Sequence, residues 1–422
     1  MMQISTKTIA IVLAGGVGSR LHPLTAERAK PSVPFGGIYR IIDFTLSNCL
    51  HSGLRKILIL TQYKSHSLNK HLRDGWSTFN PEIGEYITAI PAQMRMGGKW
   101  YAGTADAIYQ NIYLLERDEA EYVLILAGDH IYRMDYSEML KEHIEKKRDV
   151  TVACMPVSVE EAKAFGVIET DTNLRIRGFV EKVSNPPTIP GDPDQSLASM
   201  GIYVFNRNML LDILKKDHAL EISDHDFGKN ILPEIVGSHH VGAYFFGSPA
   251  GRVTRDQYWR DVGTLDAYYQ ANMDLLKPVP PINLYQRDWS IRTYHGQFPS
   301  ARMVASSSGK IGYVENASLA GGDVIIGARV IRSILSHDVR VEAGALVEES
   351  ILFDNVRVGP EARLRRCIID KGVTIPPGET IGWDKEHDGK RFTVSEKGVT
   401  VVTKGYRFPD LRPTISPITS NE

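Results

Sequence analysis

A glycine-rich turn followed by two spaced cations is the stretch of this sequence best suited to chemistry. A short apolar run leads into Gly15, Gly16 and Gly18, and the cations Arg20 and Lys30 follow. Adjacent glycines let the backbone turn sharply, so that its N–H groups can point at an anion. A guanidinium is a forked donor suited to phosphate oxygens, and a lysine adds a second charge. The stretch predicts a polyanion site, although a strand that ends in Gly-Gly can also be only a turn.

The spacing of these glycines excludes two familiar phosphate-binding motifs. The sequence here does not fit G-x-G-x-x-G, the fingerprint of dinucleotide-binding folds, and it contains no G-x-x-x-x-G-K-[ST]. We therefore expect neither a dinucleotide fingerprint nor a P-loop.

Charged residues also stand at the ends of three later segments. Asp129 follows an apolar strand at 122–127, and this is where open α/β sheets place their ligands. Glu181 and Lys182 end an alternating segment, and Asp261 precedes an expected helix. Each has a simpler interpretation, because Asp129 could cap a turn, Glu181–Lys182 could be a solvated pair and Asp261 could be a helix-entry residue.

The elements around these residues alternate between strand and helix from residue 7 to about 157, which predicts a mainly parallel sheet covered by helices. A strand is expected at 57–60, with a helix over 61–72. The segment GTADAIYQNIYLLER predicts one amphipathic helix, capped by Thr104, whose N-terminus would suit an anion or a nucleotide. After Phe165, the segments GVIET, LRIRGFVEK and ASMGIYVF predict antiparallel strands in an attached subsheet.

A six-residue repeat in the last quarter of the chain indicates a second domain. The chain has 422 residues, long for one compact domain, and KPVPP, which ends at Pro281, is typical of a linker. Apolar residues recur at six-residue steps, with a one-residue slip, at Leu346, Leu352, Val358, Leu364, Ile369, Ile375 and Ile381. This period with turn residues between predicts a parallel β-helix. We expect an α/β domain over 1–277, a linker over 278–311 and a β-helix domain over 312–422.

The composition limits the classes of protein and the kinds of partner that we expect. The formal net charge of −1 gives no reason to expect nucleic acid or an anionic membrane as partner. No apolar stretch approaches the length of a membrane span, and MMQISTKT lacks the features of a signal peptide. Cys49, Cys154 and Cys367 are far apart and odd in number, so we expect no disulfide framework and no structural zinc. A cytoplasmic protein is the simplest expectation.

Three stretches of the first fifty residues or so carry a family resemblance. LAGGVGSRLHPLT followed by AKPSVPFGG resembles the signature of the sugar-nucleotide pyrophosphorylases, which join a nucleoside triphosphate to a sugar 1-phosphate. The continuation RIIDFTLSNCLHSG is similar to the bacterial glucose-1-phosphate adenylyltransferase (ADP-glucose pyrophosphorylase) family, and the resemblance covers nearly the whole chain. It implies transfer of the adenylyl group of ATP to glucose 1-phosphate, with pyrophosphate released, for bacterial glycogen synthesis. It further implies Mg²⁺, allosteric effectors, a homotetramer, a Rossmann-like first domain with a sugar-facing subsheet, and a left-handed β-helix.

The resemblance also implies roles for individual residues. The triphosphate would be cradled by Gly15, Gly16 and Arg20, with Lys30 at the same end, and the expected catalytic set is Arg20, Lys30, Asp129 and Lys182. Mg²⁺ would be held by Asp129 and Asp261, and further nucleotide contacts are Gln93 and Gly103. The glucose 1-phosphate contacts are Tyr101, Gly166, Glu181, Lys182 and Ser199. Regulatory positions are Arg28, Arg40, Gln62 and Trp100, with Arg365 or Arg366 as a further anion contact between the domains.

One departure from the family pattern bears on regulation. In enterobacterial relatives a lysine before the Arg-Ala-Lys segment contacts fructose 1,6-bisphosphate, whereas this chain has Glu27, which would repel a bisphosphate. Pro34 stands where those relatives carry a histidine implicated in AMP inhibition. We therefore expect allosteric control by a different set of effectors.

Three other functions compete with this interpretation. The residues do not distinguish adenine from uracil, so UDP- or dTDP-glucose synthesis stays open. Hexapeptide coils also build acyltransferases, which place a catalytic histidine in the coils, and His337 lies inside the repeat. Non-catalytic exchange-factor subunits of a translation initiation factor share the two-domain plan. The joint presence here of Arg20, Lys30, Asp129, Lys182 and Asp261 argues against that last class.

Overall fold

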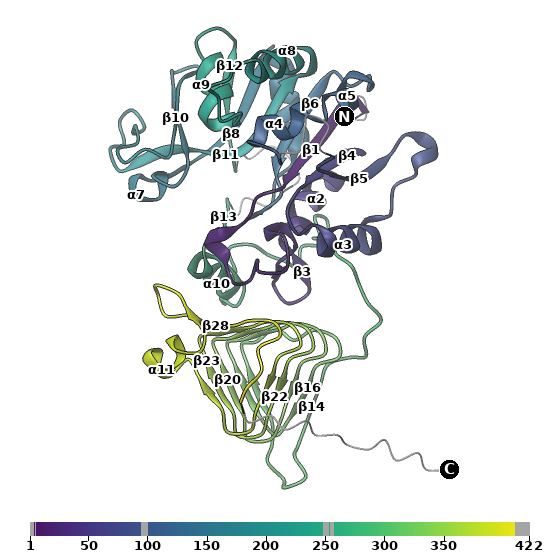
Figure 1. The fold of residues 1–422 in the computed structure, drawn as a ribbon, viewed down its shortest axis with the longest axis vertical. Coiled ribbons are helices and arrows are strands. Elements are labelled where there is room, and N and C mark those ends of the chain that lie inside the picture. Colours follow the sequence, from purple (N-terminus) through teal and green to yellow (C-terminus); the bar gives the residue numbers. More distant parts are fainter. Residues whose placement is uncertain (1–3, 5, 94–99, 248–252, 254–256, 410–422) are drawn as a thin grey trace.

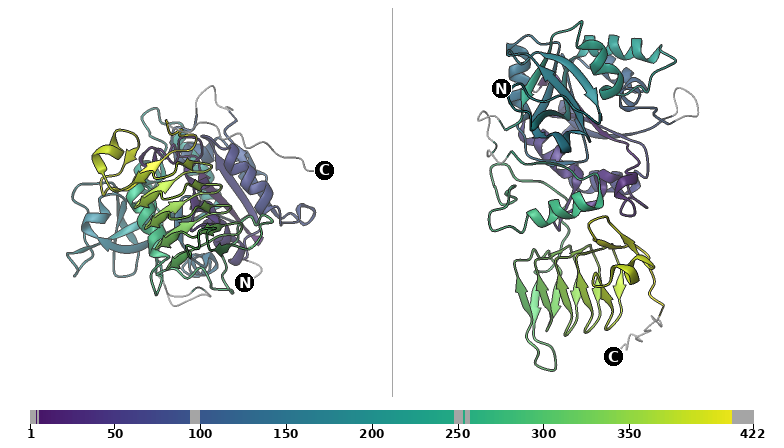
Figure 2. Two further views of the ribbon diagram at one scale, coloured as in Figure 1. Left: turned by 90° about the horizontal axis from the view of Figure 1, so that it is seen from below. Right: turned by 90° about the vertical axis from the view of Figure 1, so that its left-hand side faces the viewer.

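An α/β part and a β-helix make up the molecule (Figure 1). The structure is a computed structural model that describes residues 4, 6–93, 100–247, 253 and 257–409. The β-helix lies along one side of the α/β part, and the turned view in Figure 2 shows its coils stacked beneath that part. Among the described residues, no helix is long and apolar enough to cross a membrane.

A nine-stranded mixed sheet forms the centre of the α/β part. Its strands follow the order β10-β9-β11-β6-β1-β4-β5, and β8 pairs with both β11 and β12. Strands β6, β1, β4 and β5 are parallel, whereas β11 is antiparallel to β6, β8 and β9. The strands are β1 (Thr8–Ala14), β4 (Lys56–Thr61), β5 (Tyr86–Pro91), β6 (Tyr122–Ala127), β8 (Val150–Ser158), β9 (Gly166–Thr170), β10 (Ile176–Glu181), β11 (Gln195–Asn206) and β12 (Val241–Phe245). The expected antiparallel segments are therefore confirmed as strands, but they continue the main sheet through β11 and form no separate subsheet.

Helices cover both faces of this sheet. They are α2 (Ile41–His51), α3 (His66–Trp76), α4 (Thr104–Tyr109), α5 (Ile112–Glu116), α6 (Tyr136–Glu145), α7 (Val159–Ala162), α8 (Arg207–His218) and α9 (Leu232–Ile235), whereas α10 (Leu265–Asp274) packs in a cluster with the β-helix. Ile9 and Ile11 of β1 pack with residues of α4, α5 and α8, while Ala10 and Val12 pack with residues of α2, α3 and α6. This two-sided burial explains the continuous apolar run of β1.

A two-stranded sheet closes the end of the α/β part where the glycine turn lies. Strand β7 (His130–Tyr132) pairs antiparallel with β13 (Trp259–Asp261), and the register sets Asp261 opposite His130. Helix α10 then begins, with the Thr264 side chain accepting a hydrogen bond from the Ala267 amide at its N-terminus. The pairing brings Asp261 beside Asp129, although the two are far apart in the chain.

The β-helix consists of three five-stranded sheets built largely from parallel strands. The first has β14 (Arg302–Val304), β16 (Val324–Ile326), β19 (Arg340–Val341), β22 (Arg357–Val358) and β25 (Thr374–Ile375), and the second has β15 (Tyr313–Glu315), β17 (Arg329–Ile331), β20 (Leu346–Glu348), β23 (Arg363–Arg365) and β26 (Thr380–Ile381). The third has β18 (Ile334–Leu335), β21 (Ile351–Leu352), β24 (Cys367–Ile369), β27 (Thr393–Val394) and β28 (Thr400–Val402), with a short helix, α11 (Lys385–Gly389), between the last coil strand and β27. This arrangement confirms the predicted fold and is consistent with a left-handed β-helix.

The interior of the β-helix follows the predicted repeat with one correction. Leu352, Val358 and Leu364 are fully buried in its core, as predicted. Val347, and not Leu346, is the buried residue of β20, because successive side chains of a strand point to opposite faces. The first coil strand, β14, lies within the stretch 278–311 that we expected to be a linker.

The β-helix packs against the α/β part through a shared apolar cluster. Phe35 and Tyr268 of the α/β part share this cluster with Ile351 and Phe353 of the β-helix. Hydrogen bonds reinforce the contact, because the Tyr269 hydroxyl donates to the Glu349 carbonyl at 2.6 Å. The third sheet of the β-helix thus faces α10 and the segment that follows the glycine turn.

Candidate active site

One cavity of about 560 Å³ lies at the carboxyl ends of β1 and β6 and extends to the end of β10. Most of the residues that the sequence singles out line it. These are Gly15, Gly16, Arg20, Lys30, Gln62, Tyr101, Gly103, Asp129, Gly166, Glu181, Lys182, Ser199 and Asp261. The open α/β sheet therefore brings its polar strand ends to one place.

The glycine turn folds back onto the cations that follow it. Gly18 has φ 64°, a conformation that favours glycine, and a Cβ there would lie 3.2 Å from the Cβ of Lys30. The Thr25 hydroxyl donates to the Gly18 carbonyl at 2.9 Å and fixes the turn. A Cβ at Gly16 would meet no atom within 4 Å, so the backbone there is open to the cavity. A ligand can approach this turn closely.

The Lys30 ammonium lies between two carboxylates. Its Nζ is 2.9 Å from Asp129 Oδ2 and 2.7 Å from Asp261 Oδ1. Burial works to lower the pKa of Lys30, but the two carboxylates raise it above its ordinary value. Burial likewise works to raise the pKa of Asp129, and the charge of Lys30 outweighs it and holds that pKa at about 2. Both groups are therefore charged at neutral pH.

Asp129, His130 and Asp261 form a group that could hold a metal ion. One candidate ligand atom from each lies within 4.8 Å of the others. Arg20 approaches the same group, with Nη2 3.8 Å from Asp261 Oδ2. Two carboxylates suit Mg²⁺, which takes oxygen ligands and keeps several waters.

A second polar group lies in the same cavity at the end of β10. Lys182 is paired with Glu181, and its side chain is 56% exposed. The Glu181 carboxylate packs against two glycines, since a Cβ at either Gly166 or Gly228 would lie 2.6 Å from its Oε2. This close packing orients the Glu181 carboxylate. The exposed Lys182 side chain can reach a ligand in the cavity.

The helix beside the cavity departs from the prediction. Instead of one helix capped by Thr104, the chain forms α4 and α5, and the Thr104 hydroxyl donates to Asp226 Oδ2 at 2.9 Å. The amides of Ala105 and Asp106 donate to the His225 carbonyl at 2.8 and 3.2 Å. The Ala105 and Asp106 amides at this helix N-terminus are therefore not available to an anion, because they already have a partner within the chain.

Comparison with known proteins adds to this geometry. Residues 9–278 match the nucleotidyl transferase family, and residues 299–402 match the family described as GlmU-like, C-terminal hexapeptide. The glucose-1-phosphate adenylyltransferase 2 of Vibrio cholerae is 59% identical over 401 residues, which are 95% of this chain and 98% of the relative. The protein of the same name from Vibrio parahaemolyticus is 59% identical over 400 residues, 95% of this chain and 99% of the relative.

The chain belongs to the glucose-1-phosphate adenylyltransferase family. The resemblance noted in the sequence is thereby confirmed, and the protein is an enzyme of a nucleotidyltransferase family.

Several predicted residues of this adenylyltransferase family member lie outside the cavity. Gln93 and Trp100 flank residues 94–99, which lie outside the described part of the chain, and neither lines the cavity. Arg28 and Arg40 lie near the contact with the β-helix. The predicted set is thus divided between the cavity and its surroundings.

The cavity also has lining residues that sequence reasoning missed. They are His130, Tyr203, Asp226, Phe227, Gly228 and Trp259. Asp226 caps the short helical turn Phe227–Ile231, since its Oδ1 accepts from the amides of Gly228 and Lys229. An Asp-x-Gly sequence after a helix indicates such a capped turn. It does not indicate where in the fold the turn will pack, and so it does not place Asp226 at the cavity.

Gly103→Ala is expected to lower the free energy of unfolding by about 1–3 kcal/mol. The new Cβ would lie 2.3 Å from both the Asp224 and the His225 carbonyl oxygens, and these backbone atoms cannot move without breaking the contacts of α4. Chemical denaturation followed by circular dichroism measures the change. Gly16→Ala is the control, because its Cβ meets nothing within 4 Å. Equal stability of the two variants would contradict the proposed steric contact.

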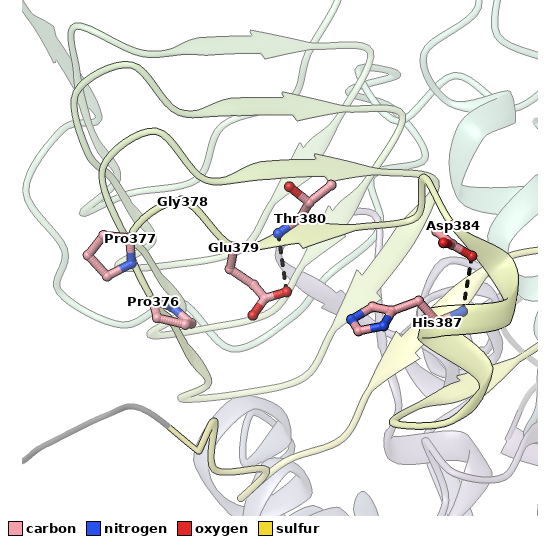
Figure 3. Close-up of a pocket in the computed structure, with 7 residues that line it drawn as sticks. All are labelled: Pro376, Pro377, Gly378, Glu379, Thr380, Asp384 and His387. Carbon is pink, nitrogen blue, oxygen red and sulfur yellow. Dashed lines mark hydrogen bonds between the residues drawn. The ribbon is translucent and has the colours of Figure 1, made fainter.

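A separate hollow of about 500 Å³ lies on the last coils of the β-helix (Figure 3). It is bordered by Glu379, Asp384 and His387. Glu379 accepts a hydrogen bond from Arg391 at 2.9 Å, and Asp384 accepts from the amides of Glu386 and His387. Its carboxylates are satisfied within the chain, so the hollow shows no sign of a second site.

Proposed function

We propose that this protein transfers the adenylyl group of ATP to α-D-glucose 1-phosphate, giving ADP-glucose and pyrophosphate. The observation that carries the proposal is a single cavity in which Lys30 bridges Asp129 and Asp261 beside a glycine turn, and which also holds Lys182. Relatives named glucose-1-phosphate adenylyltransferase support the same reaction.

The reaction needs charge compensation more than a base. A phosphate oxygen of glucose 1-phosphate attacks the α-phosphorus of ATP, the new P–O bond forms, and the bond to the pyrophosphate oxygen breaks. A phosphate monoester loses its second proton near pH 6, so the nucleophile is already an anion at neutral pH. The site must therefore suppress repulsion between two polyanions and stabilise charge on the departing pyrophosphate.

The triphosphate is assigned to the glycine turn. The backbone of Gly15 and Gly16, which is open at Gly16, would receive phosphate oxygens, and Arg20 would contact the departing β and γ groups. Lys30 would assist Arg20 at the same end of the triphosphate. Gln93 and Gly103 are proposed as contacts to the rest of the nucleotide, as the resemblance implies.

Glucose 1-phosphate is assigned to the end of β10. Lys182 would hold the sugar phosphate, and Glu181, oriented by its close packing against Gly166, would accept hydrogen bonds from sugar hydroxyls. Tyr101 and Ser199 complete this proposed subsite. The two substrates then meet in one cavity.

The residues present also fit a magnesium ion. Asp129 and Asp261 would be its protein ligands, because their oxygens lie within 4.8 Å of each other in the open cavity. When bound, Mg²⁺ neutralises phosphate charge and supplies Lewis-acid polarisation of the reacting phosphate.

A panel of nucleotides tests the proposed reaction. We expect the protein, incubated with glucose 1-phosphate and Mg²⁺, to release pyrophosphate fastest with ATP. The assay compares ATP, UTP, dTTP, CTP and GTP at equal concentration. A clear preference for UTP or dTTP would replace the proposal by UDP- or dTDP-glucose synthesis. No release with any nucleotide would favour a non-catalytic member of the same fold.

We further propose that an anionic effector binds where the β-helix meets the α/β part. Arg28 is buried there, and its Nη1 has no hydrogen-bond partner among the described residues. Arg40 lies nearby, with Nη1 2.8 Å from the Ser67 hydroxyl, and Arg366 lies over the Tyr269 ring. These donors support a regulatory site. Gln62 and Trp100 are proposed to pass the signal to the cavity, where the Gln62 amide donates to the Tyr101 carbonyl at 3.5 Å.

Fructose 1,6-bisphosphate is expected to leave the rate of ADP-glucose formation nearly unchanged. Glu27 places a carboxylate at this position, and its pairing with Lys404 Nζ at 2.6 Å leaves the two side chains with no net positive charge for a bisphosphate. Rate assays with and without the effector at subsaturating ATP measure the response. Full activation would contradict this account of the effector set.

The remaining parts of the proposal concern organisation. We propose a catalytic domain over 1–277, a linker that follows it, and a β-helix domain that begins with β14 and serves regulation and assembly. A homo-oligomer is proposed because the open end of a β-helix leaves sheet edges that need cover, and the family resemblance implies that it is a homotetramer. Buried free cysteines accord with a cytoplasmic location. The product would supply glucosyl units for glycogen synthesis.

A further inference from the structure

Lys30 occupies the space between the two carboxylates that are assigned to the metal. The residue is only 6% exposed, and its Nζ contacts Asp129 at 2.9 Å and Asp261 at 2.7 Å. It lies at the start of a short helical turn, Lys30–Ser32, directly after a segment that Arg28 fastens to Asp370. The lysine is therefore held inside the site by two ion pairs and is not a surface cation.

The charges of the two carboxylates and of the two cations beside them nearly cancel without any metal. Two carboxylates carry −2, Lys30 returns +1, and the Arg20 guanidinium adds a second cation 3.8 Å from Asp261. A divalent cation that arrives alone thus meets little net negative charge. Carboxylate oxygens bind Mg²⁺ at about 2.0–2.1 Å, so an ammonium cannot stay between the same two oxygens when the ion enters.

We propose that Lys30 is the resident counter-ion of the metal-binding pair and gives up that place only when the metal arrives with a triphosphate. Asp129 and Asp261 would then hold the metal, and the Lys30 ammonium would pair with the triphosphate oxygens. The inference rests on the proposed function, because it assumes a nucleotide as the second partner of Lys30. The proposal has one testable consequence, namely that the protein without nucleotide should bind divalent metal weakly.

Mn²⁺ alone is the probe that tests the exchange. Electron paramagnetic resonance of free Mn²⁺ measures binding to the full chain, without nucleotide, for wild type and Lys30→Met. We expect Lys30→Met to bind one Mn²⁺ per chain at least about tenfold more tightly than wild type, because the variant uncovers two carboxylates. Adding Asp261→Asn to Lys30→Met should abolish the gain. Lys182→Met is the matched control, since it removes a lysine from the same cavity that is paired with Glu181, and it should show no gain.

The proposal is overturned if Lys30→Met binds Mn²⁺ no more tightly than wild type, or if Lys182→Met gains equally. Lys30→Gln provides a second neutral variant if the methionine variant does not fold, as judged by circular dichroism. Wild type offers a test that needs no substitution, because the protein should bind Mn²⁺ far more tightly with a non-hydrolysable ATP analogue than alone, after subtraction of the Mn²⁺ that the analogue binds without protein. Equal affinity in both conditions would overturn the exchange. Failure of the proposed function would instead appear as no pyrophosphate release, a readout independent of Mn²⁺ binding without nucleotide.

Discussion

Asp129→Asn is expected to lower kcat by about 10²- to 10³-fold, the loss typical of removing one preorganised charge from a reacting centre. Asparagine keeps the size of the side chain but removes the charge that pairs with Lys30 and that would hold Mg²⁺. Pyrophosphate release at saturating ATP and glucose 1-phosphate measures the change, and circular dichroism checks that the fold is retained.

Asp224→Asn is a matched control for this substitution. Asp224 is exposed, pairs with Lys229 at 2.7 Å and lies outside the cavity lining, so its removal should leave kcat within about twofold. Chelation by EDTA should stop the wild-type reaction, and added Mg²⁺ should restore it. A mild effect of Asp129→Asn, or full activity in EDTA, would remove Asp129 from its proposed place.

Arg28→Ala is expected to lower the free energy of unfolding by about 3–5 kcal/mol, since it breaks a buried ion pair. Arg28 Nη2 lies 2.8 and 3.1 Å from the two Asp370 oxygens, and both side chains are less than a tenth exposed. The substitution leaves the Asp370 carboxylate buried, with the Lys371 amide as its remaining hydrogen-bond donor among the described residues. Chemical denaturation followed by tryptophan fluorescence measures the loss.

Two further variants isolate the effect of burial. Lys404→Ala breaks the exposed pair with Glu27, which joins the same two parts of the molecule, and it should cause no measurable loss. The double variant Arg28→Met with Asp370→Leu removes both charges and should recover most of the stability. If Arg28→Ala costs no more than Lys404→Ala, the buried pair does not stabilise the contact.

The sequence predicts the structure correctly wherever the local pattern of residues alone determines where a segment lies in the fold. The run that ends at Gly15 predicts a strand buried on two faces, and the strand that ends before Asp129 predicts a carboxylate at the sheet edge; both predictions are confirmed. The six-residue period predicts the β-helix for the same reason, because each coil repeats the same local geometry.

The errors occur where a distant segment decides the outcome. The start of α4 looks like a free helix N-terminus, but the His225 carbonyl, contributed by a later loop, accepts its amides. Leu346 fits the repeat as well as Val347, and only the strand register of β20 selects the buried one. Asp261 joins Asp129 through the pairing of β13 with β7, and no local pattern predicts which strands pair across such a distance.

The ion pairs of Lys30 with Asp129 and Asp261 also limit when the site can form during synthesis on the ribosome. Lys30 is separated in the chain by 99 residues from Asp129 and by 231 from Asp261. Non-local contacts of this kind are made late, because the entropy of closing the intervening chain must be lost first. A nascent chain that ends before β13 therefore lacks one of the two carboxylates. The Arg28 contact, 342 residues from its partner, waits even longer. Chains that end before β13 should be inert, and the β-helix, translated after the α/β part, completes the anchoring of the segment that carries Lys30.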